Sequence, residues 1–426
     1  MASFPQIPEW VQLEHRVAQI LTDQEIHGWH FDENAARELE SSLRRELEAL
    51  TQLLRNRYPL IFDREFTPRR VNRSLGYVEG ATVSKLKEFS PTSRDHIAWI
   101  MQKHHGWVPE KKTKAGKTAI DEVVLKEIGT EEALQFFRCL ELTKQLGMLS
   151  EGNNAWLKLV RNERIHHHCS VSTNTHRCAH RNPNLAQVPS DIAFRKLFRA
   201  SPGYVMVGAD LAGIELRMLA HYLARYDGGR YGHVLLNGDI HQENADKIGI
   251  SRRLVKTVTY AFLYGAGDQK IGLSYDQSLS PDKAKAKGAE IRGAYVSAID
   301  GLADLLSAVR AAGERGSVKS IDGRKIKIDS PHKALNYLLQ SGAGVVAKRW
   351  MVIANDNFPT IDNDYLFHTH QLAFIHDELQ WECLPEYAED LREHLELCAS
   401  LAGEHYNLRI PIAAEGKIGS TWADVH

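Results

Sequence analysis

The sequence has too few cysteines, spread too widely, to build a disulfide framework. Its 426 residues include five cysteines, an odd number that contains no CxxC pair. Small disulfide-dependent secreted proteins carry an even and closely spaced set, so these thiols are expected to stay reduced. The five positions are Cys139, Cys169, Cys178, Cys383 and Cys398. A cytoplasmic location is therefore expected.

Export signals, membrane spans and a strong net charge are also missing. The opening residues, MASFPQIPEWVQLEH, lack the basic and then apolar pattern of a leader, and no run of about 18 apolar residues is present to cross a bilayer. The formal net charge is -1, so a polyanionic partner would have to be bound by local basic patches. Short basic runs occur at residues 67–73, 110–117 and 323–327, and each alone is more typical of a solvated surface.

The chain is long enough, at 43% hydrophobic residues, for two or three subdomains with their own cores. Residues 8–58 and about 92–160 have the apolar spacing of long amphipathic helices, with Asp32 as a plausible N-cap. Between them, residues 59–90 are expected to form an irregular, exposed excursion.

Strand character appears in two later parts of the chain. Residues 165–222 predict short strands and turns, including an apolar run from Tyr204 to Val207 that ends at Asp210. Residues 223–355 are again mostly helical in pattern, and residues 371–384 return to strands. The sequence thus predicts a mixed α+β protein.

One predicted helix carries a cationic and aromatic face. In RRLVKTVTYAFLYGAG, residues 252–267, four side chains recur every four positions: Arg252, Lys256, Tyr260 and Tyr264. Residues at this spacing lie along one side of a helix, so the face is positive at one end and aromatic at the other. A nucleoside triphosphate has the matching layout of phosphates and flat base. The alternative is an ordinary surface helix with half-buried tyrosines, and the segment alone leaves both open.

Two aspartates are candidates for metal ligands. Asp210 and Asp377 both follow apolar strand runs that would hold them at the edge of a sheet. Two such carboxylates are able to bind a pair of Mg²⁺ ions that activate a hydroxyl and stabilise a leaving pyrophosphate. A single strand-end aspartate is more often a turn residue, so the prediction depends on the pair.

Three motifs in order resemble those of the family A, DNA polymerase I-like, DNA polymerases: DLAGIELR at 210–217, RLVKTVTYAFLYG at 253–265 and IHDEL at 375–379. NPNLAQVPS at 182–190 and the closing EGKIGSTWADVH extend the resemblance, which is strongest to the replicative enzymes of T-odd podophages. It covers nearly the whole chain and implies a right-hand polymerase fold with an antiparallel palm sheet. The implied subdomains are a helical thumb at 1–165, palm at 166–222 and 336–426, and fingers at 223–335.

The resemblance also implies roles for individual residues in the addition of deoxynucleotides to a primer 3′ end. Asp210, Asp377 and the backbone carbonyl of Leu211 would bind two Mg²⁺ ions. Glu215 would occupy the space of a ribose 2′-hydroxyl. The incoming nucleotide would be held by His241, Arg252, Lys256, Tyr260 and Tyr264. Primer-template DNA would be contacted by Arg177, Asn336, Gln340 and His376, whose minor-groove contacts suit every correct base pair.

This chain departs from the family near Arg177. The family commonly has Thr-Gly-Arg there, whereas this chain has Thr-His-Arg at 175–177. The surrounding run HHHCSVSTNTHRCAH suggests a zinc site. Its spacing matches no usual zinc finger, however, and strand alternation directs neighbouring residues to opposite faces, so no metal site is expected there. The candidate ligands in the run are His166, His167, His168, Cys169, His176, Cys178 and His180.

Two features of the family are not expected in this chain. A 3′–5′ exonuclease would need its own α/β domain ahead of a helical region that here begins near residue 10, so proofreading is expected to be missing or supplied by a separate exonuclease. The podophage insertion that captures host thioredoxin is replaced by the short excursion at 56–90, so thioredoxin is not an expected partner, although another processivity factor is possible. If the source is viral, the location would be the host cytoplasm.

Two other functions remain open from the sequence. A single-subunit RNA polymerase is disfavoured because Glu215 would block the ribose 2′-hydroxyl and so act as a gate that selects the sugar. A non-catalytic primer-template binding factor is disfavoured because both aspartates are present, together with the basic ladder, the series Arg252, Lys256, Tyr260 and Tyr264. The expected enzyme is a DNA-directed DNA polymerase acting in phage DNA replication.

Overall fold

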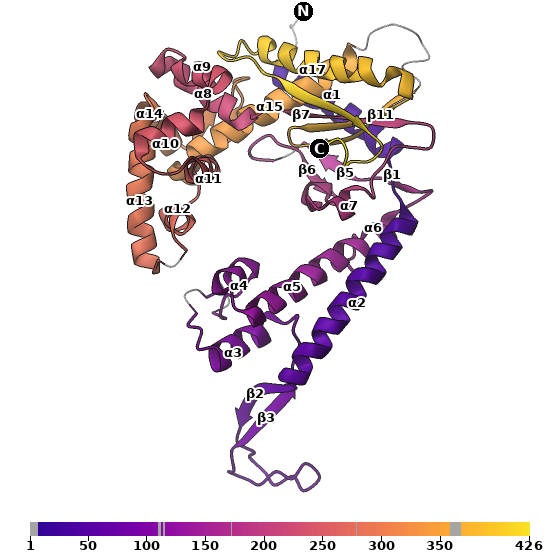
Figure 1. The fold of residues 1–426 in the computed structure, drawn as a ribbon, viewed down its shortest axis with the longest axis vertical. Helices are drawn as coiled ribbons and strands as arrows, with labels where there is room; N and C mark the ends of the chain where they lie inside the picture. The colour runs from indigo at the N-terminus through magenta and orange to yellow at the C-terminus, as the bar shows by residue number, and fades with distance from the viewer. Residues whose placement is uncertain (1–6, 110–111, 114–115, 172, 278, 358–367) are drawn as a thin grey trace, which may run out of the picture. The chain divides into compact units, whose positions relative to one another are not determined.

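The computed structural model describes residues 7–109, 112–113, 116–171, 173–277, 279–357 and 368–426. It divides into two compact units, and Figure 1 labels the elements of each. The larger unit contains Met1–Asp32 and Leu159–His426, and the smaller unit contains Glu33–Lys158. Part of the basic run at 110–117 lies outside the described residues. None of the described helices combines the length and apolar character needed to span a bilayer.

The larger unit is built around a four-stranded antiparallel sheet. Its strand order is β10–β11–β7–β12, and every neighbouring pair is antiparallel. The strands are β7 (Val205–Leu211), β10 (Thr369–Ile375), β11 (Glu378–Cys383) and β12 (Ala414–Gly419). Nearly every residue of β10 and β11 is buried, including the polar residues Glu378, Gln380 and Glu382 of β11. The predicted α+β class with an antiparallel sheet is confirmed.

Three helices of the larger unit pack with this sheet. They are α1 (Glu9–His27), α15 (Ala334–Asp356) and α17 (Ala388–His405). Helix α17 contacts β7 and β12, while α1 contacts β10 and α15. A buried ion pair joins α1 to α15, because Lys348 Nζ lies 2.7 Å from Glu14 Oε2. Since Arg324 also pairs with Glu14, the basic run at 323–327 includes a core residue.

A group of helices fills the chain between β7 and α15. They are α8 (Ile214–Asp227), α9 (Arg230–Asn237), α10 (Ile240–Ile248), α11 (Arg252–Leu263), α12 (Asp268–Tyr275), α13 (Pro281–Ala298) and α14 (Leu302–Glu314). Helices α12 and α13 approach closely, since a Cβ added to Gly288 would lie 1.7 Å from the Asp268 carbonyl oxygen. The predicted helical pattern holds, apart from a short hairpin of β8 (Ser317–Lys319) and β9 (Lys325–Lys327).

Short elements complete the larger unit. Strand β1 (Trp29–His30) pairs with β4 (Arg164–Ile165), and β5 (His168–Ser170) pairs with β6 (Ala179–Arg181). A single turn, α7 (Ile192–Arg195), follows, and α6 (Trp156–Leu159) lies where the two units meet in sequence.

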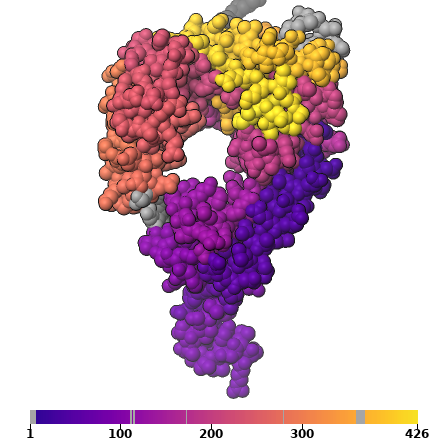
Figure 2. Space-filling view, in the orientation of Figure 1, coloured from indigo at the N-terminus to yellow at the C-terminus, as the bar shows by residue number. Residues whose placement is uncertain are grey.

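The smaller unit is helical with one protruding hairpin. Its helices are α2 (Glu33–Arg57), α3 (Arg94–His104), α4 (Glu122–Ile128) and α5 (Glu131–Leu146). They share a core that includes Leu54, Phe89 and Phe136. The predicted irregular excursion is instead an antiparallel hairpin of β2 (Leu60–Phe66) and β3 (Val83–Glu88), which projects from the helices of this unit (Figure 2). Its strands are mostly exposed and so lack the apolar alternation that marks a strand.

Candidate active site

The structure brings Asp210 and Asp377 together at one end of β7 and β11, the two central strands of the sheet. Asp210 lies near the end of β7, and Asp377 lies in the two-residue turn between β10 and β11. The backbone N–H of Leu211 donates to the carbonyl oxygen of Asp377 at 3.0 Å, and Asp210 is the register partner of Glu378. Adjacent antiparallel strands thus hold both aspartates in fixed backbone positions.

The turn that carries Asp377 is conformationally unusual. His376 has a φ of 62°, in the left-handed region that glycine favours. A side chain held there costs about 1–3 kcal/mol, a cost that is often found at functional sites. The ring of His376 lies edge-on to that of His180, and its buried Nδ1 atom has no hydrogen-bond partner among the described residues.

The protein raises the pKa of both aspartates. Burial raises the pKa of Asp377 to about 7, with further repulsion from Glu215 and Asp210, against the opposing effect of Arg177. Loss of hydration, followed by repulsion from Glu378, raises the pKa of Asp210 to about 6, although one side of this residue stays exposed. Carboxylates gathered in this way repel one another, and a bound divalent cation would relieve that repulsion.

The donor set fits a hard cation. The carboxylates of Asp210 and Asp377 and the backbone carbonyl group of Leu211 all offer oxygen, which Mg²⁺ prefers. Burial and the neighbouring carboxylates together raise the pKa of both aspartates, and the nearby Arg177 offsets this only in part at Asp377. The residues that the sequence suggested as metal ligands are therefore of the right kind and in one place.

Glu215 is fixed between two other predicted residues. It lies in the first turn of α8, five residues after Asp210. Its Oε1 atom accepts hydrogen bonds from Arg177 Nη2 at 2.9 Å and from the Tyr264 hydroxyl at 3.0 Å. Only 12% of its side chain is exposed, so Glu215 is not a solvated carboxylate.

Helix α11 carries the basic ladder as the spacing predicts. Ser251 caps the helix by accepting a hydrogen bond from the Leu254 backbone N–H group. The buried face of the helix contains Val255, Val258, Thr259, Phe262 and Leu263. Arg252 and Lys256 lie on the exposed side, and burial increases from Lys256 to the half-buried Tyr260.

The phosphate end of the ladder has a partner that the sequence did not reveal. Asp239, the N-cap of α10, accepts a hydrogen bond from Arg252 Nε at 2.6 Å. Lys256, by contrast, is exposed and has no ion pair with any residue that the structure describes. An incoming anion would therefore find Lys256 without an ion pair among the described residues, whereas Arg252 would have to exchange its contact with Asp239 for one with the anion.

His241 lies beside the ladder, within α10. Its ring centroid is 6.3 Å from that of Tyr260, and its buried Nδ1 atom lacks a partner in the described part of the chain. Burial lowers the pKa of His241, and the neighbouring cations Arg252 and Lys256 lower it further while Asp239 raises it. A bound phosphate would supply the acceptor that this imidazole lacks.

Helix α15 positions the remaining predicted residues. The amide of Asn336 donates to the Leu263 carbonyl oxygen, which ties α15 to the end of α11. Gln340 lies one helical turn later and is half-buried. Gly344 gives room for the loop around Arg177, because a Cβ added to Gly344 would lie 3.2 Å from Arg177 Cγ.

His176 explains the departure from the family motif before Arg177. It has a φ of 60°, a conformation that the family's glycine adopts without strain. Its Nδ1 atom lies 2.6 Å from Ser341 Oγ, so the bulky ring is held against α15 and Arg177 still reaches Glu215.

The closing segment of the chain contributes a contact that sequence reasoning missed. Glu378 is buried, and its Oε1 atom accepts hydrogen bonds from Trp422 Nε1 and Gln380 Nε2, both at 2.6 Å. His426 Nδ1 lies 3.1 Å from the other carboxylate oxygen. The conspicuous tryptophan in GSTWADVH was the available signal, but nothing local connects it to Glu378.

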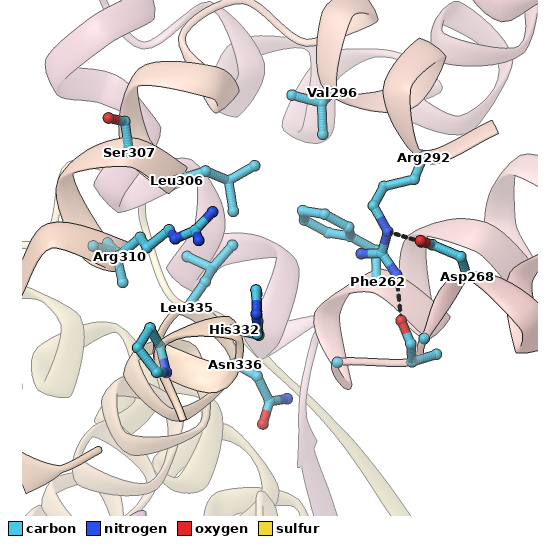
Figure 3. A pocket seen from close by; sticks show the side chains of 15 residues that line it. Phe262, Asp268, Arg292, Val296, Leu306, Ser307, Arg310, His332, Leu335 and Asn336 are labelled. Carbon is cyan, nitrogen blue, oxygen red and sulfur yellow. Dashed lines mark hydrogen bonds and ion pairs between the residues drawn. The ribbon is translucent and has the colours of Figure 1, made fainter. Parts of the chain in front are cut away.

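A cavity of about 650 Å³ opens beside the end of α11. Figure 3 shows Arg310 and His332 at this cavity, with Arg292 opposite them. Arg292 is held there by Asp268, at 2.6 Å, and by the Ala266 carbonyl oxygen. The cavity therefore combines two arginines, one of them paired with Asp268, with a mainly apolar lining, next to the glycines at 265 and 267.

Comparisons with known proteins agree with this geometry. The model of the family described as DNA polymerase family A matches residues 68–424. The DNA-directed DNA polymerases of Enterobacteria phage T3 and Escherichia phage T7 are each 32% identical to this chain, over 98% of it and 70% of the relative.

A solved structure shares the fold. The POL domain of Pol1 from M. smegmatis, in a complex with DNA primer-template and dNTP, aligns with a TM-score of 0.75. The alignment covers 97% of this chain and 70% of that chain, at 20% sequence identity. At this identity the likeness establishes the fold alone.

Proposed function

The chain belongs to DNA polymerase family A and is a DNA-directed DNA polymerase, and from this premise we propose how its residues perform template-directed synthesis. The reaction is attack of a primer 3′-hydroxyl on the α-phosphate of a deoxynucleoside triphosphate, with release of pyrophosphate. Positioning and electrostatic stabilisation dominate the catalysis of such phosphoryl transfers.

The proposed subdomains follow the right-hand plan. The smaller unit, Glu33–Lys158, would form most of the thumb, which we place within residues 1–165. The sheet with α15 and α17, in 166–222 and 336–426, is the palm. The helices α9–α14, in 223–335, are the fingers.

Asp210, Asp377 and the Leu211 carbonyl group would hold two Mg²⁺ ions. When bound, these ions would favour the ionised form of the primer hydroxyl and neutralise charge on the leaving pyrophosphate. The two aspartates must ionise to bind them, and the backbone pairing at the ends of the adjacent strands would keep both residues close together.

The face of α11 would bind the nucleotide. Lys256 and Arg252 would contact the triphosphate, with His241 donating from its unpartnered ring nitrogen. Tyr260 would lie beside the sugar and phosphates, and Tyr264 at the nascent base pair. The distance along a helix from Lys256 to Tyr264, about 12 Å, suits the length of a nucleoside triphosphate.

Glu215 would exclude ribonucleotides. Arg177 and Tyr264 hold its carboxylate through hydrogen bonds, so it would fill the space of a 2′-hydroxyl with a restrained side chain. This gate favours a DNA polymerase over the RNA polymerase alternative.

The primer-template DNA would lie against Arg177, Asn336, Gln340 and His376. These side chains offer hydrogen-bond donors, and the minor-groove acceptors N3 and O2 occur on every correct pair. The contacts would therefore test base-pair geometry without reading sequence.

We propose that these 426 residues carry no 3′–5′ exonuclease activity. The two compact units account for the thumb, palm and fingers, and neither is a separate α/β metal-binding domain within the described ranges. A separate exonuclease or processivity factor would then be a partner. The small hairpin β2–β3 favours a factor other than thioredoxin, and the phage relatives favour action in a host cytoplasm.

The observation that carries this mechanism is the convergence of Asp210 and Asp377 with Glu215 near the end of α11. The test is extension of a primed DNA template by the purified chain with Mg²⁺ and either deoxy- or ribonucleotides. We expect extension in the reaction with deoxynucleotides and little or none in the reaction with ribonucleotides. Efficient use of ribonucleotides would support the RNA polymerase alternative, and binding without extension would support a non-catalytic factor.

A further inference from the structure

Strands β5 and β6 bring three metal-binding side chains into one buried cluster. Cys169 on β5 and His180 on β6 are directly opposite in register, and His167 precedes β5. One candidate ligand atom from each residue lies within 4.8 Å of the other two. The side chains are almost fully buried, and His167 is 0% exposed.

Strand alternation assembles this cluster rather than preventing it. His166 and His168 turn toward α1, where their Nδ1 atoms lie 2.8 Å from the carbonyl oxygen and from a carboxylate oxygen of Glu25, respectively. His167 and Cys169 are two residues apart and so share the opposite, buried face. The alternation argument against a zinc site therefore applies to neighbours but not to this pair.

The cluster has unsatisfied polar atoms. His167 Nδ1 and His180 Nε2 are buried and have no hydrogen-bond partner in the described part of the chain. A buried polar atom without a partner costs about 1–3 kcal/mol. Within the described residues, one ring nitrogen of each imidazole is thus left without a partner.

The ionisation states suit metal binding. Burial lowers the pKa of His167 to about 3 and that of His180 to about 4, so both imidazoles are neutral at physiological pH. A neutral imidazole is the form that coordinates metals. Burial raises the pKa of the Cys169 thiol, so coordination would displace its proton to solvent.

The donor set selects a class of metal. Two imidazoles and a thiolate suit Zn²⁺ and related transition metals, whereas Mg²⁺ and Ca²⁺ require oxygen ligands. Zn–N and Zn–S bonds of about 2.0 and 2.3 Å give a tetrahedral N···S separation of about 3.5 Å. Cys169 Sγ lies 3.2 Å from His180 Nδ1, close to that value.

We propose that His167, Cys169 and His180 form a structural site for a zinc-class ion. The fourth position would be taken by water. Gln24 of α1 borders the site, since its Nε2 atom lies 3.1 Å from His167 Nε2. The site would connect α1, β5 and β6. Since the His180 ring contacts that of His376, at a centroid distance of 5.6 Å, it would also support the turn that carries Asp377.

Cobalt binding to the full, reduced chain tests the proposal without reference to polymerase activity. After removal of bound metal with a chelator, titration with Co²⁺ is expected to give one tight equivalent, a thiolate-to-cobalt charge-transfer band and intense tetrahedral d–d bands, all removed by Zn²⁺. All five cysteines are buried, so surface histidines that bind Co²⁺ would not produce the thiolate band. A wild-type chain that shows no such band would overturn the proposal.

Matched cysteine variants identify the ligand. Cys169→Ser is expected to remove the charge-transfer band and weaken Zn²⁺ binding by more than about tenfold, while circular dichroism reports whether it folds. The control is Cys178→Ser, which changes a buried cysteine two residues before His180 but outside the cluster, and should keep the band. If Cys169→Ser fails to fold, His167→Gln should still weaken binding. A band lost in Cys178→Ser but kept in Cys169→Ser would reject this ligand set.

Discussion

The hydroxyl group of Tyr264 donates a hydrogen bond of 3.0 Å to the carboxylate of Glu215, which joins the end of α11 to the first turn of α8. Arg177, in the segment between β5 and β6, donates to the same carboxylate oxygen. The proposed gate is therefore a small network in which the nucleotide-binding helix itself positions the excluding side chain. Movement of α11 would change the position of Glu215.

Shortening Glu215 should open the gate. In Glu215→Ala, deoxynucleotide insertion should remain measurable, while the preference for deoxy- over ribonucleotides falls by roughly tenfold or more, because the 2′-hydroxyl no longer meets a side chain. Single-nucleotide insertion kinetics with both substrates measure the ratio of kcat/KM values. An unchanged ratio would remove Glu215 from the sugar site.

Two further variants separate bulk from charge and from positioning. Glu215→Gln keeps the size of the side chain and should retain most of the discrimination. Tyr264→Phe removes only the hydroxyl group and should weaken discrimination less than Glu215→Ala does. Equal effects of Gln and Ala at position 215 would show that the charge, and not the volume, is decisive.

Removing either of the two aspartates proposed as metal ligands should abolish extension. Asp210→Ala and Asp377→Ala are each expected to reduce primer extension by roughly a thousandfold or more, because several kcal/mol of metal-dependent stabilisation is lost. Duplex binding, measured by fluorescence anisotropy, should stay largely intact since phosphate and groove contacts dominate affinity. Glu415→Ala is the control, because this exposed carboxylate pairs in register with Asp210 on the other side. Comparable loss in all three variants would argue against specific ligation.

Local patterns predicted the helix and strands that carry the candidate site. The four-residue spacing is a property of α11 alone, and the structure confirms the helix. The apolar run before Asp210 likewise predicts β7 without knowledge of its neighbours. Short-range hydrophobic and charge patterns were sufficient in both places.

Contacts between distant segments were not predictable from local patterns. Glu378 is buried because Trp422 and His426 return to it from the end of the chain. Arg252 is paired because Asp239 both caps α10 and faces α11. Neither relationship leaves a periodic signal in the sequence, since each depends on how two elements pack.

The sequence did not predict the hairpin β2–β3 for a different reason. Its strands are exposed on most positions, so their stability comes from cross-strand pairs rather than a buried face. His176 and His376 were also beyond sequence reasoning, because non-glycine residues with positive φ are uncommon and have no reliable local signature.

A mismatched primer should remain intact. Given a primer with a mismatched 3′ end, Mg²⁺ and no nucleotides, the purified chain is expected not to shorten the strand, because no separate exonuclease site is proposed within these residues. Gel analysis over time, with a proofreading polymerase as a positive control, makes the measurement. Trimming that disappears in Asp377→Ala would mean that the site assigned to synthesis also performs hydrolysis.

Tyr260 should control the use of dideoxynucleotides. Its half-buried ring lies near His241, and its hydroxyl would interact where a missing 3′-hydroxyl would have contributed. Tyr260→Phe should raise discrimination against dideoxynucleotides by about tenfold or more, with little loss on normal substrates. Competitive incorporation of the two nucleotides measures this ratio. Tyr264→Phe is the matched control. An equal rise in both variants would contradict the placement of Tyr260 beside the nucleotide sugar.

The raised pKa of Asp377 predicts a stability cost for the candidate metal site. Its folded pKa is about 7 against an ordinary value of 3.8, so the folded state retains a proton that the unfolded state releases. This contribution is fully present below about pH 4 and is lost as the pH rises through 7. In chelator, Asp377→Asn should therefore unfold with a free energy roughly 1–2 kcal/mol above wild type at about pH 8, and with no difference near pH 4. Urea unfolding at both pH values measures the difference, and Mg²⁺ should stabilise wild type more than the variant. A difference that does not depend on pH would show that the substitution acts through packing, and that the carboxylates do not repel one another in the way the site requires.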